Sequence, residues 1–129
     1  MRYARQRAAA TPENAVLLLS LGDGTTEGIQ GKHVSEAARQ GDPVAVDSFR
    51  ELARWAGAGL ADLASLFDPS AFIVGGGVSD EGELVLDPIR KSFRRWLIGG
   101  AWRPHAQVLA AQLGGKAGLV GAADLARQG

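Results

Sequence analysis

Cysteine is absent from this sequence of 129 residues, and neither sign of charge is in excess. Without cysteine the chain has no disulfide framework, no thiolate nucleophile and no cysteine-ligated zinc. Lys and Arg number 14 and Asp and Glu number 14, a formal net charge of +0 that argues against the dense positive field of nucleic-acid-binding proteins. Because no apolar run approaches the length of a membrane span and the first residues lack a signal-peptide core, we expect a soluble cytoplasmic protein.

Histidine is also scarce, with two in the chain. Neither His33 nor His105 has a paired carboxylate motif, and we expect His105 to be structural. His33 stands in a glycine-rich loop and could contact a ligand or a metal, although a solvated loop histidine is the better interpretation. We therefore predict no catalytic residue and no metal ligand. The basic run that includes Arg90 and Arg94 has helical spacing and indicates a solvated helix face, not a nucleic-acid site.

The first third of the sequence predicts three short helices, at Tyr3–Ala10, Ala15–Leu19 and Val34–Gln40. Gly41 suits the left-handed end of the third helix. The sequence Asp42-Pro43 then caps a long amphipathic helix, and Asp68-Pro69 ends it. Its apolar residues recur at helical spacing: Phe49, Leu52, Ala53, Ala56, Leu60, Leu63, Ala64 and Phe67. Gly57 and Gly59 in its middle indicate close approach of another backbone or a ligand, with close helix packing favoured.

The second half of the sequence alternates strand and helix patterns. Ala71–Val74 predicts a buried strand, and Ala106–Leu113 predicts a second one. Helices are predicted at Glu83–Ile98 and Ala117–Arg127, which gives an α/β unit with a crossover connection. Because a sheet of two strands leaves both edges unpaired, we expect a partner chain or further sequence to supply neighbours. The pattern therefore indicates a portion of a larger fold.

Three consecutive glycines, Gly75 to Gly77, break the first strand before a helical segment. A turn without Cβ atoms lets a ligand lie against main-chain N–H groups, although a turn without any ligand is an equally good interpretation of the local pattern. A Walker A motif is excluded because Glu83 stands where lysine is required, and a dinucleotide fingerprint lacks its third glycine. The acidic residues Asp80, Glu81 and Glu83 behind the turn would repel phosphate, so a nucleotide should present its adenosine end here.

Four segments in combination resemble the C-terminal lobe of the ROK-family sugar kinases, most closely the actinobacterial glucokinases. They are Gly41-Asp42-Pro43-Val44-Ala45, Leu60-Ala61-Asp62-Leu63-Ala64-Ser65-Leu66-Phe67-Asp68-Pro69, Ile73-Val74-Gly75-Gly76-Gly77-Val78-Ser79 and Gly118-Leu119-Val120-Gly121-Ala122-Ala123. The resemblance covers nearly the whole chain. It implies the C-terminal lobe of an actin-like (ribonuclease H-like) kinase fold, helix-rich with few strands and incomplete by itself.

The resemblance assigns roles to particular residues. Gly75, Gly76 and Gly77 match the family's adenosine-binding turn, and Val78 and Ser79 would flank it. The helices that begin at Asp42 and Ala117 resemble the family's two hinge helices. Gly57, Gly59, Gly118 and Gly121 would keep these two helices close together. On this basis residues 1–41 form a helical and loop region, and residues 42–129 form the adenosine-binding α/β unit. The family generally forms dimers or tetramers, so a homo-oligomer is expected.

The family's phosphate loops, catalytic aspartate, and zinc and sugar-binding motif have no counterpart in this sequence. We therefore predict an inactive portion of an ATP-dependent glucokinase, with ATP contacting it through adenosine, and with Mg²⁺ and glucose bound only in the intact enzyme. The first alternative is the same lobe of a ROK-family transcription regulator that responds to sugars. The second is a self-standing interaction module that dimerises through strand edges.

Overall fold

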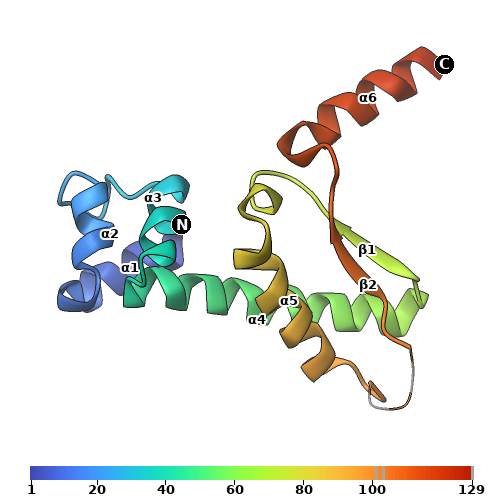
Figure 1. The fold of residues 1–129 in the computed structure, drawn as a ribbon, viewed down its shortest axis with the longest axis horizontal. Helices are drawn as coiled ribbons and strands as arrows, with labels where there is room; N and C mark the ends of the chain where they lie inside the picture. Colours follow the sequence, from blue (N-terminus) through green and yellow to red (C-terminus); the bar gives the residue numbers. More distant parts are fainter. Residues whose placement is uncertain (101, 103, 129) are drawn as a thin grey trace. The chain divides into compact units, whose positions relative to one another are not determined.

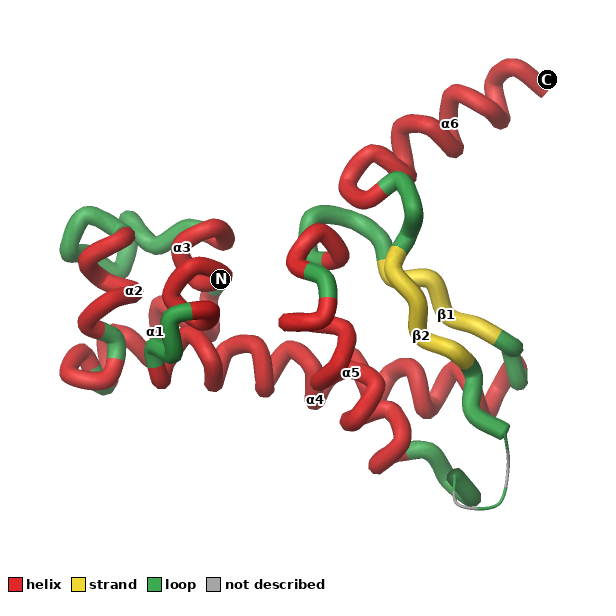
Figure 2. Tube along the Cα trace, in the orientation of Figure 1, coloured by secondary structure: helices red, strands yellow, loops and turns green. Residues whose placement is uncertain are grey.

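The computed structural model describes residues 1–100, 102 and 104–128, and the chain divides into two compact units, Met1–Leu52 and Ala53–Gly129. Figure 1 gives the order of the helices and strands along the chain, and Figure 2 separates them by type. Helices make up most of the described residues. The described residues contain a sheet of two strands, which agrees with the predicted helix-rich α/β class.

The first unit contains α1 (Arg2–Ala10), a 3₁₀ turn (Pro12–Asn14), α2 (Val16–Leu21), α3 (Gly31–Arg39) and the beginning of α4 (Pro43–Phe67). These helices confirm the predicted ones to within a few residues. Alanines dominate the buried positions, so helix backbones can approach closely. The buried apolar residues of this unit are Ala4, Ala8, Ala15, Leu18, Ile29, Val34, Ala37, Ala38, Val44 and Ala45.

Asp42 caps two helices with one carboxylate. Its Oδ1 accepts the N–H of Ala45 at 3.0 Å in the first turn of α4, and its Oδ2 accepts the N–H of Leu18 at 3.1 Å in the first turn of α2. The residue is 5% exposed, and Gly41 before it has the left-handed φ of 84° predicted for the end of α3. The capping role predicted for Asp42 is therefore confirmed, and it extends to a second helix.

A second link joins α1 to α4 within this unit. The Tyr3 hydroxyl donates to Oδ2 of Asp47 at 2.7 Å, and the Arg7 guanidinium lies 3.6 Å from the same oxygen. The hydrogen bond to Asp47, followed by desolvation and the charge of that carboxylate, raises the pKa of Tyr3 above its ordinary value. The pair is on the surface and contributes modestly.

The second unit contains the rest of α4, β1 (Ala71–Val74), α5 (Glu83–Trp96), β2 (Gln107–Ala110) and α6 (Ala117–Gln128). Two 3₁₀ turns, Ser79–Glu81 and Gly114–Lys116, follow the strands. The strands pair in parallel with Ala71 opposite Gln107 and Val74 opposite Ala110, so the predicted crossover through a helix is confirmed. β2 is shorter than predicted because the chain turns at Leu113 into the second 3₁₀ segment.

The helix α5 forms the centre of this unit. Its buried side chains are Val85, Leu86, Ile89 and Phe93. The ring of Phe93 meets Phe72 of β1 edge to face at a centroid distance of 5.8 Å, and Val108 beside Phe72 is buried. On this side the sheet is covered by α5.

Gly57 brings α4 against α5. A Cβ atom at Gly57 would lie 2.4 Å from Oγ of Ser92 and 2.6 Å from the backbone nitrogen of Phe93, so a side chain here has no room. The close approach predicted for Gly57 is confirmed. At Gly59, Gly118 and Gly121 a Cβ would meet none of the described residues within 4 Å, so close approach at these positions stays a prediction.

The other face of the sheet contradicts the prediction of a buried strand. Ile73 is 63% exposed, and Leu109 opposite it in the register is also exposed. Alternation along the strands puts Phe72 and Val108 on the covered face and these two residues on the other. Within the described residues the sheet is therefore packed on one side.

Candidate functional site

The five predicted site residues, Gly75, Gly76, Gly77, Val78 and Ser79, form the turn that leaves β1. Gly76 has a φ of 82°, which suits glycine because a Cβ is strained in the left-handed region. Ser79 is 5% exposed and closes the turn: its N–H and its hydroxyl both donate to the Gly76 carbonyl, at 3.0 and 2.7 Å. The shape of the turn is therefore held by two hydrogen bonds to one oxygen.

The turn presents free donors beside open space. A Cβ at Gly76 or Gly77 would meet none of the described residues within 4 Å. The N–H groups of Gly76, Gly77 and Val78 donate to no acceptor in the part of the chain that the structure describes. The Val78 side chain is 44% exposed. The turn thus combines hydrogen-bond donors with a small apolar surface, which suits a ligand that has both acceptor atoms and an apolar face.

A second loop lies beside this turn. Because β1 and β2 are parallel, their carboxyl ends share one edge of the sheet, where ligands bind in open α/β folds. The Asp80 carboxylate accepts the N–H of Gly115 at 3.2 Å, and so joins the turn after β1 to the 3₁₀ turn after β2. Gly114 has a φ of 51°, and a Cβ on it would lie 2.5 Å from Oδ1 of Asp80. The two glycines at 114 and 115 therefore make room for this carboxylate.

The acidic residues behind the turn do not act as one cluster. Asp80 is directed to Gly115, and Glu83 at the start of α5 pairs with Arg90. The sequence alone missed the Asp80 contact. Its signal was the pair Gly114-Gly115 after the second strand, which repeats the placement of the triple glycine after the first.

The two histidines differ from each other in environment. Nδ1 of His33 accepts the backbone N–H of Gln30 at 3.2 Å and completes a capping box at the start of α3, so the predicted loop position of His33 is wrong. His105 lies just before β2. Among the described residues there is no group of three or more His, Cys, Asp or Glu side chains that could hold a metal ion.

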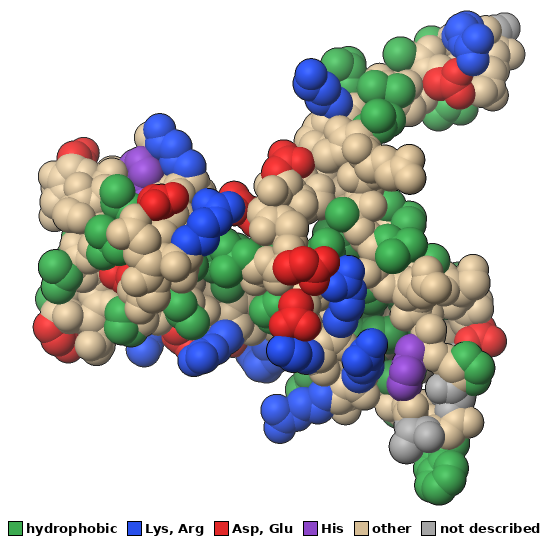
Figure 3. All heavy atoms as spheres, in the orientation of Figure 1, with side chains coloured by type: hydrophobic (Ala, Val, Ile, Leu, Met, Phe, Trp, Pro, Cys, Tyr) green, Lys and Arg blue, Asp and Glu red, His purple; other side chains and the backbone are tan. Residues whose placement is uncertain are grey.

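Two basic residues of α5, Arg90 and Lys91, form ion pairs within the helix. Lys91 pairs with Asp87 at 2.7 Å, and Arg90 pairs with Glu83 and donates from Nε to the Val108 carbonyl at 2.9 Å. In the region of α5, Figure 3 shows Lys and Arg side chains interspersed with Asp and Glu side chains. This agrees with the predicted solvated helix face.

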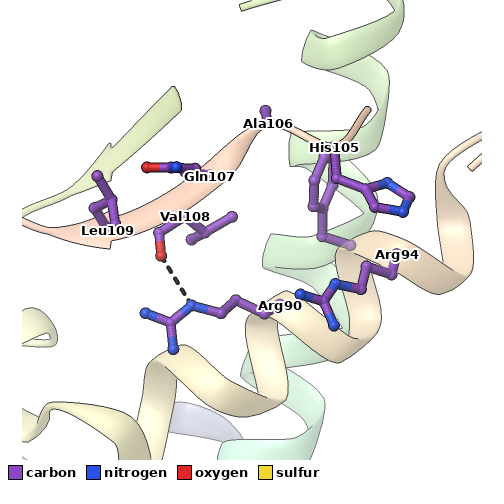
Figure 4. A pocket seen from close by; sticks show the side chains of 8 residues that line it. Arg90, Arg94, His105, Ala106, Gln107, Val108 and Leu109 are labelled. Atoms are coloured by element: carbon purple, nitrogen blue, oxygen red, sulfur yellow. Dashed lines mark hydrogen bonds between the residues drawn. The ribbon is translucent and has the colours of Figure 1, made fainter. Parts of the chain in front are cut away.

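Two hollows lie away from the predicted turn. A cavity of about 210 Å³ between α5 and β2 is lined by Arg90, Phe93, Arg94 and residues 105–109, as Figure 4 shows. A second of about 400 Å³ involves Asp68, Pro69, Ser70 and residues 104–106. Both include residues that precede β2, whereas ligands of parallel sheets bind beyond the carboxyl ends. The turn after β1 is the better candidate for a ligand site.

The fold agrees with a match to a known family. The model of the ROK family matches residues 5–129, and the chain belongs to that family. Its two-stranded α/β arrangement is part of the actin-like kinase fold found in the family's glucokinases.

The individual relatives are glucokinases. Over 128 residues the chain is 80% identical to glucokinase from Streptomyces coelicolor, and over 105 residues it is 30% identical to glucokinase from Thermotoga maritima. It is similar, with a TM-score of 0.96 and 91% identity, to the crystal structure of a ROK family glucokinase from Streptomyces griseus in complex with glucose and AMPPNP. The comparisons give no support to the transcription-regulator alternative.

The match covers different shares of the two chains in each comparison. It includes 99% of this chain but 40% of the Streptomyces coelicolor glucokinase and 41% of the Streptomyces griseus chain. The chain therefore spans less than half the length of these relatives. In the described residues no helix is both long enough and apolar enough to cross a membrane.

Proposed function

We propose that this chain is the adenosine-nucleotide-binding portion of an ATP-dependent glucokinase, and that the turn from Gly75 to Ser79 receives the adenosine of ATP. The observation that carries this proposal is the turn itself, with three unused N–H donors beside open space at the carboxyl end of β1. The Streptomyces griseus relative was crystallised with AMPPNP and glucose, which supports a nucleotide site in this family.

The chain by itself should not phosphorylate glucose. Phosphoryl transfer depends on positioning the two substrates and stabilising the charge that develops between them. The described residues contain no group of three or more His, Cys, Asp or Glu side chains that could hold a metal ion, and the sequence has no counterpart of the family's catalytic aspartate. Glucose and Mg²⁺ would be bound by the intact enzyme, which we expect to be a cytoplasmic homo-oligomer.

The nucleotide site can be tested by calorimetric titration of the chain with ATP. Gly76→Asp puts a carboxylate in the open space of the turn, and it should weaken ATP binding tenfold or more. Gly24→Asp is a matched control, because Gly24 has a φ of 83° and equally open surroundings in the first unit. Binding to this control should equal binding to the unmodified chain. Equal heats from the Gly76→Asp variant and the unmodified chain would contradict the proposal.

A coupled assay for glucose 6-phosphate tests the predicted inactivity. The purified 129-residue chain with ATP, Mg²⁺ and glucose should give the rate of the protein-free blank. ATP-dependent product formation by the chain would overturn this part of the proposal and leave the nucleotide site intact.

A further inference from the structure

The cavity between α5 and β2 is basic in character. Arg90 and Arg94, four residues apart on one face of α5, line one side of it, and His105 lines it from the segment that precedes β2 (Figure 4). The other described residues that line the cavity are uncharged. Positive groups around a hollow whose lining contains no negative group raise the local concentration of anions. The cavity therefore favours a negatively charged ligand.

The two arginines of this cavity differ in their partners. Arg90 is held in place, because it pairs with Glu83 and its Nε donates to the Val108 carbonyl at 2.9 Å. The side chain of Arg94, one turn further along α5, forms no ion pair or hydrogen bond with the described residues. A guanidinium presents its donors in a planar fork that matches the oxygens of carboxylates and phosphates. Arg94 is therefore the group available to pair with an anion.

The edge of β2 that faces away from β1 adds backbone donors. The Gln107 N–H donates to Ser70 at 3.0 Å on the β1 side, so alternation along the strand directs the backbone groups of Val108 to the other edge. The N–H groups of Ala106 and Val108 donate to no acceptor among the described residues. Val108 is 3% exposed, and a buried N–H normally has a partner. An acceptor bound in the cavity would supply that partner.

The size of the cavity limits what it can bind. Its volume is about 210 Å³. Pockets for drug-sized ligands and cofactors have volumes of roughly 300–1,000 Å³, whereas one water molecule takes about 30 Å³ of the liquid. The cavity is therefore small for a nucleotide, but it has room for a tetrahedral anion together with a few water molecules or a short ester group.

We propose that this cavity is a binding site for a phosphate group, either as the free ion or as a small phosphate ester. Arg94 supplies the charge, and His105 donates from a ring nitrogen, as both the neutral and the protonated imidazole do. The backbone N–H groups of Ala106 and Val108 complete the set of donors. The tetrahedral oxygens of phosphate suit donors from both α5 and β2 better than the two oxygens of a carboxylate do. The nucleotide proposal concerns the turn after β1, so each proposal holds or fails separately.

The test is titration of the chain with inorganic phosphate at constant ionic strength, followed in ¹H–¹⁵N NMR spectra. The amide signals of Ala106 and Val108 should shift and reach saturation, whereas those of Gly76 and Gly77 should stay in place. A second titration with glycerol 3-phosphate distinguishes the two sources of the group, because the natural one should bind more tightly. Shifts confined to the triple glycine, or shifts throughout the chain that do not saturate, would overturn the proposal.

Two variants of α5 show whether Arg94 carries the contact. Arg94→Gln should raise the Kd for inorganic phosphate at least tenfold, because it removes a charge-assisted hydrogen-bond donor. Arg95→Gln is the matched control: it removes the same charge from the next residue, which does not line the cavity, and it should change the Kd less than twofold. Both side chains are exposed, so circular dichroism should be the same for the two variants and the unmodified chain. Equal effects of the two substitutions on the Kd would contradict the assigned site.

Discussion

The helices α3 and α6 have 9 and 12 residues, yet α3 buries four of its residues and α6 buries none. In α3 the buried residues Val34, Ala37 and Ala38 share one side, and charged residues such as Glu36 and Arg39 occupy the other. In α6 apolar residues extend around the helix. The comparison shows that the amphipathic helix α3 is packed within its own unit, whereas α6, with apolar residues on several sides, has no buried residue among those described.

The largest expected difference in the free energy of unfolding is between removing a covered apolar side chain and removing an exposed one. Phe93→Ala should lower the free energy of unfolding by about 3–5 kcal/mol, because it empties the contact between α5 and β1. Leu119→Ala in α6 should change it by no more than about 0.5 kcal/mol. Urea unfolding of both variants followed by circular dichroism gives the two values. A loss from Leu119→Ala as large as that from Phe93→Ala would show that α6 is packed in the chain by itself.

A smaller effect, with opposite signs, should distinguish two glycines of the same helix. Gly57→Ala should destabilise by about 1–3 kcal/mol, because the new methyl group would collide with Ser92 and Phe93. Gly59→Ala has open space and should stabilise by about 0.5–1 kcal/mol through helix propensity. Thermal unfolding of the two variants is the measurement. Stabilisation by Gly57→Ala would mean that α4 and α5 do not approach at Gly57, and destabilisation by Gly59→Ala would mean that Gly59 has no open space.

The smallest effect concerns the surface link between α1 and α4. The folded chain holds the Tyr3 proton more tightly than the unfolded chain, since the hydrogen bond to Asp47 raises the pKa of Tyr3. This contribution is present below pH of about 10 and is lost as the pH rises through the folded pKa. Tyr3→Phe should therefore remove part of the fall in stability above pH 10. Urea unfolding at pH 8 to 11 tests this, and an unchanged slope would argue against the bond.

The secondary structure could largely be predicted from the sequence, because each element has a local signal. Neighbouring residues in the sequence determine the helix caps at Gly41 and Asp42 and the strand at Ala71–Val74. The structure confirms the positions of all three. The exposure of Ile73 could not be predicted in this way. An apolar run indicates that a strand prefers burial, but it does not say whether the covering protein lies in the same chain.

The sequence predicts the residues of the candidate turn, but it does not predict the hydrogen bond that joins this turn to the loop after β2. The triple glycine is a local signal for a turn, whereas the contact of Asp80 with Gly115 joins residues 35 positions apart. No periodicity connects a side chain with a distant backbone N–H. The paired glycines at 114 and 115 become interpretable once the parallel register brings the two loops together.

The double cap at Asp42 has a consequence for how the first unit opens. The Asp42 carboxylate caps the starts of both α2 and α4. It accepts the N–H of Leu18, 24 residues earlier in the chain, and the N–H of Ala45, three residues later. Fraying of either helix start would release a buried carboxylate from the other, so the two starts should open in one step. In native-state hydrogen exchange, the amides of Leu18 and Ala45 should share one opening free energy and behave as a single cooperative folding unit.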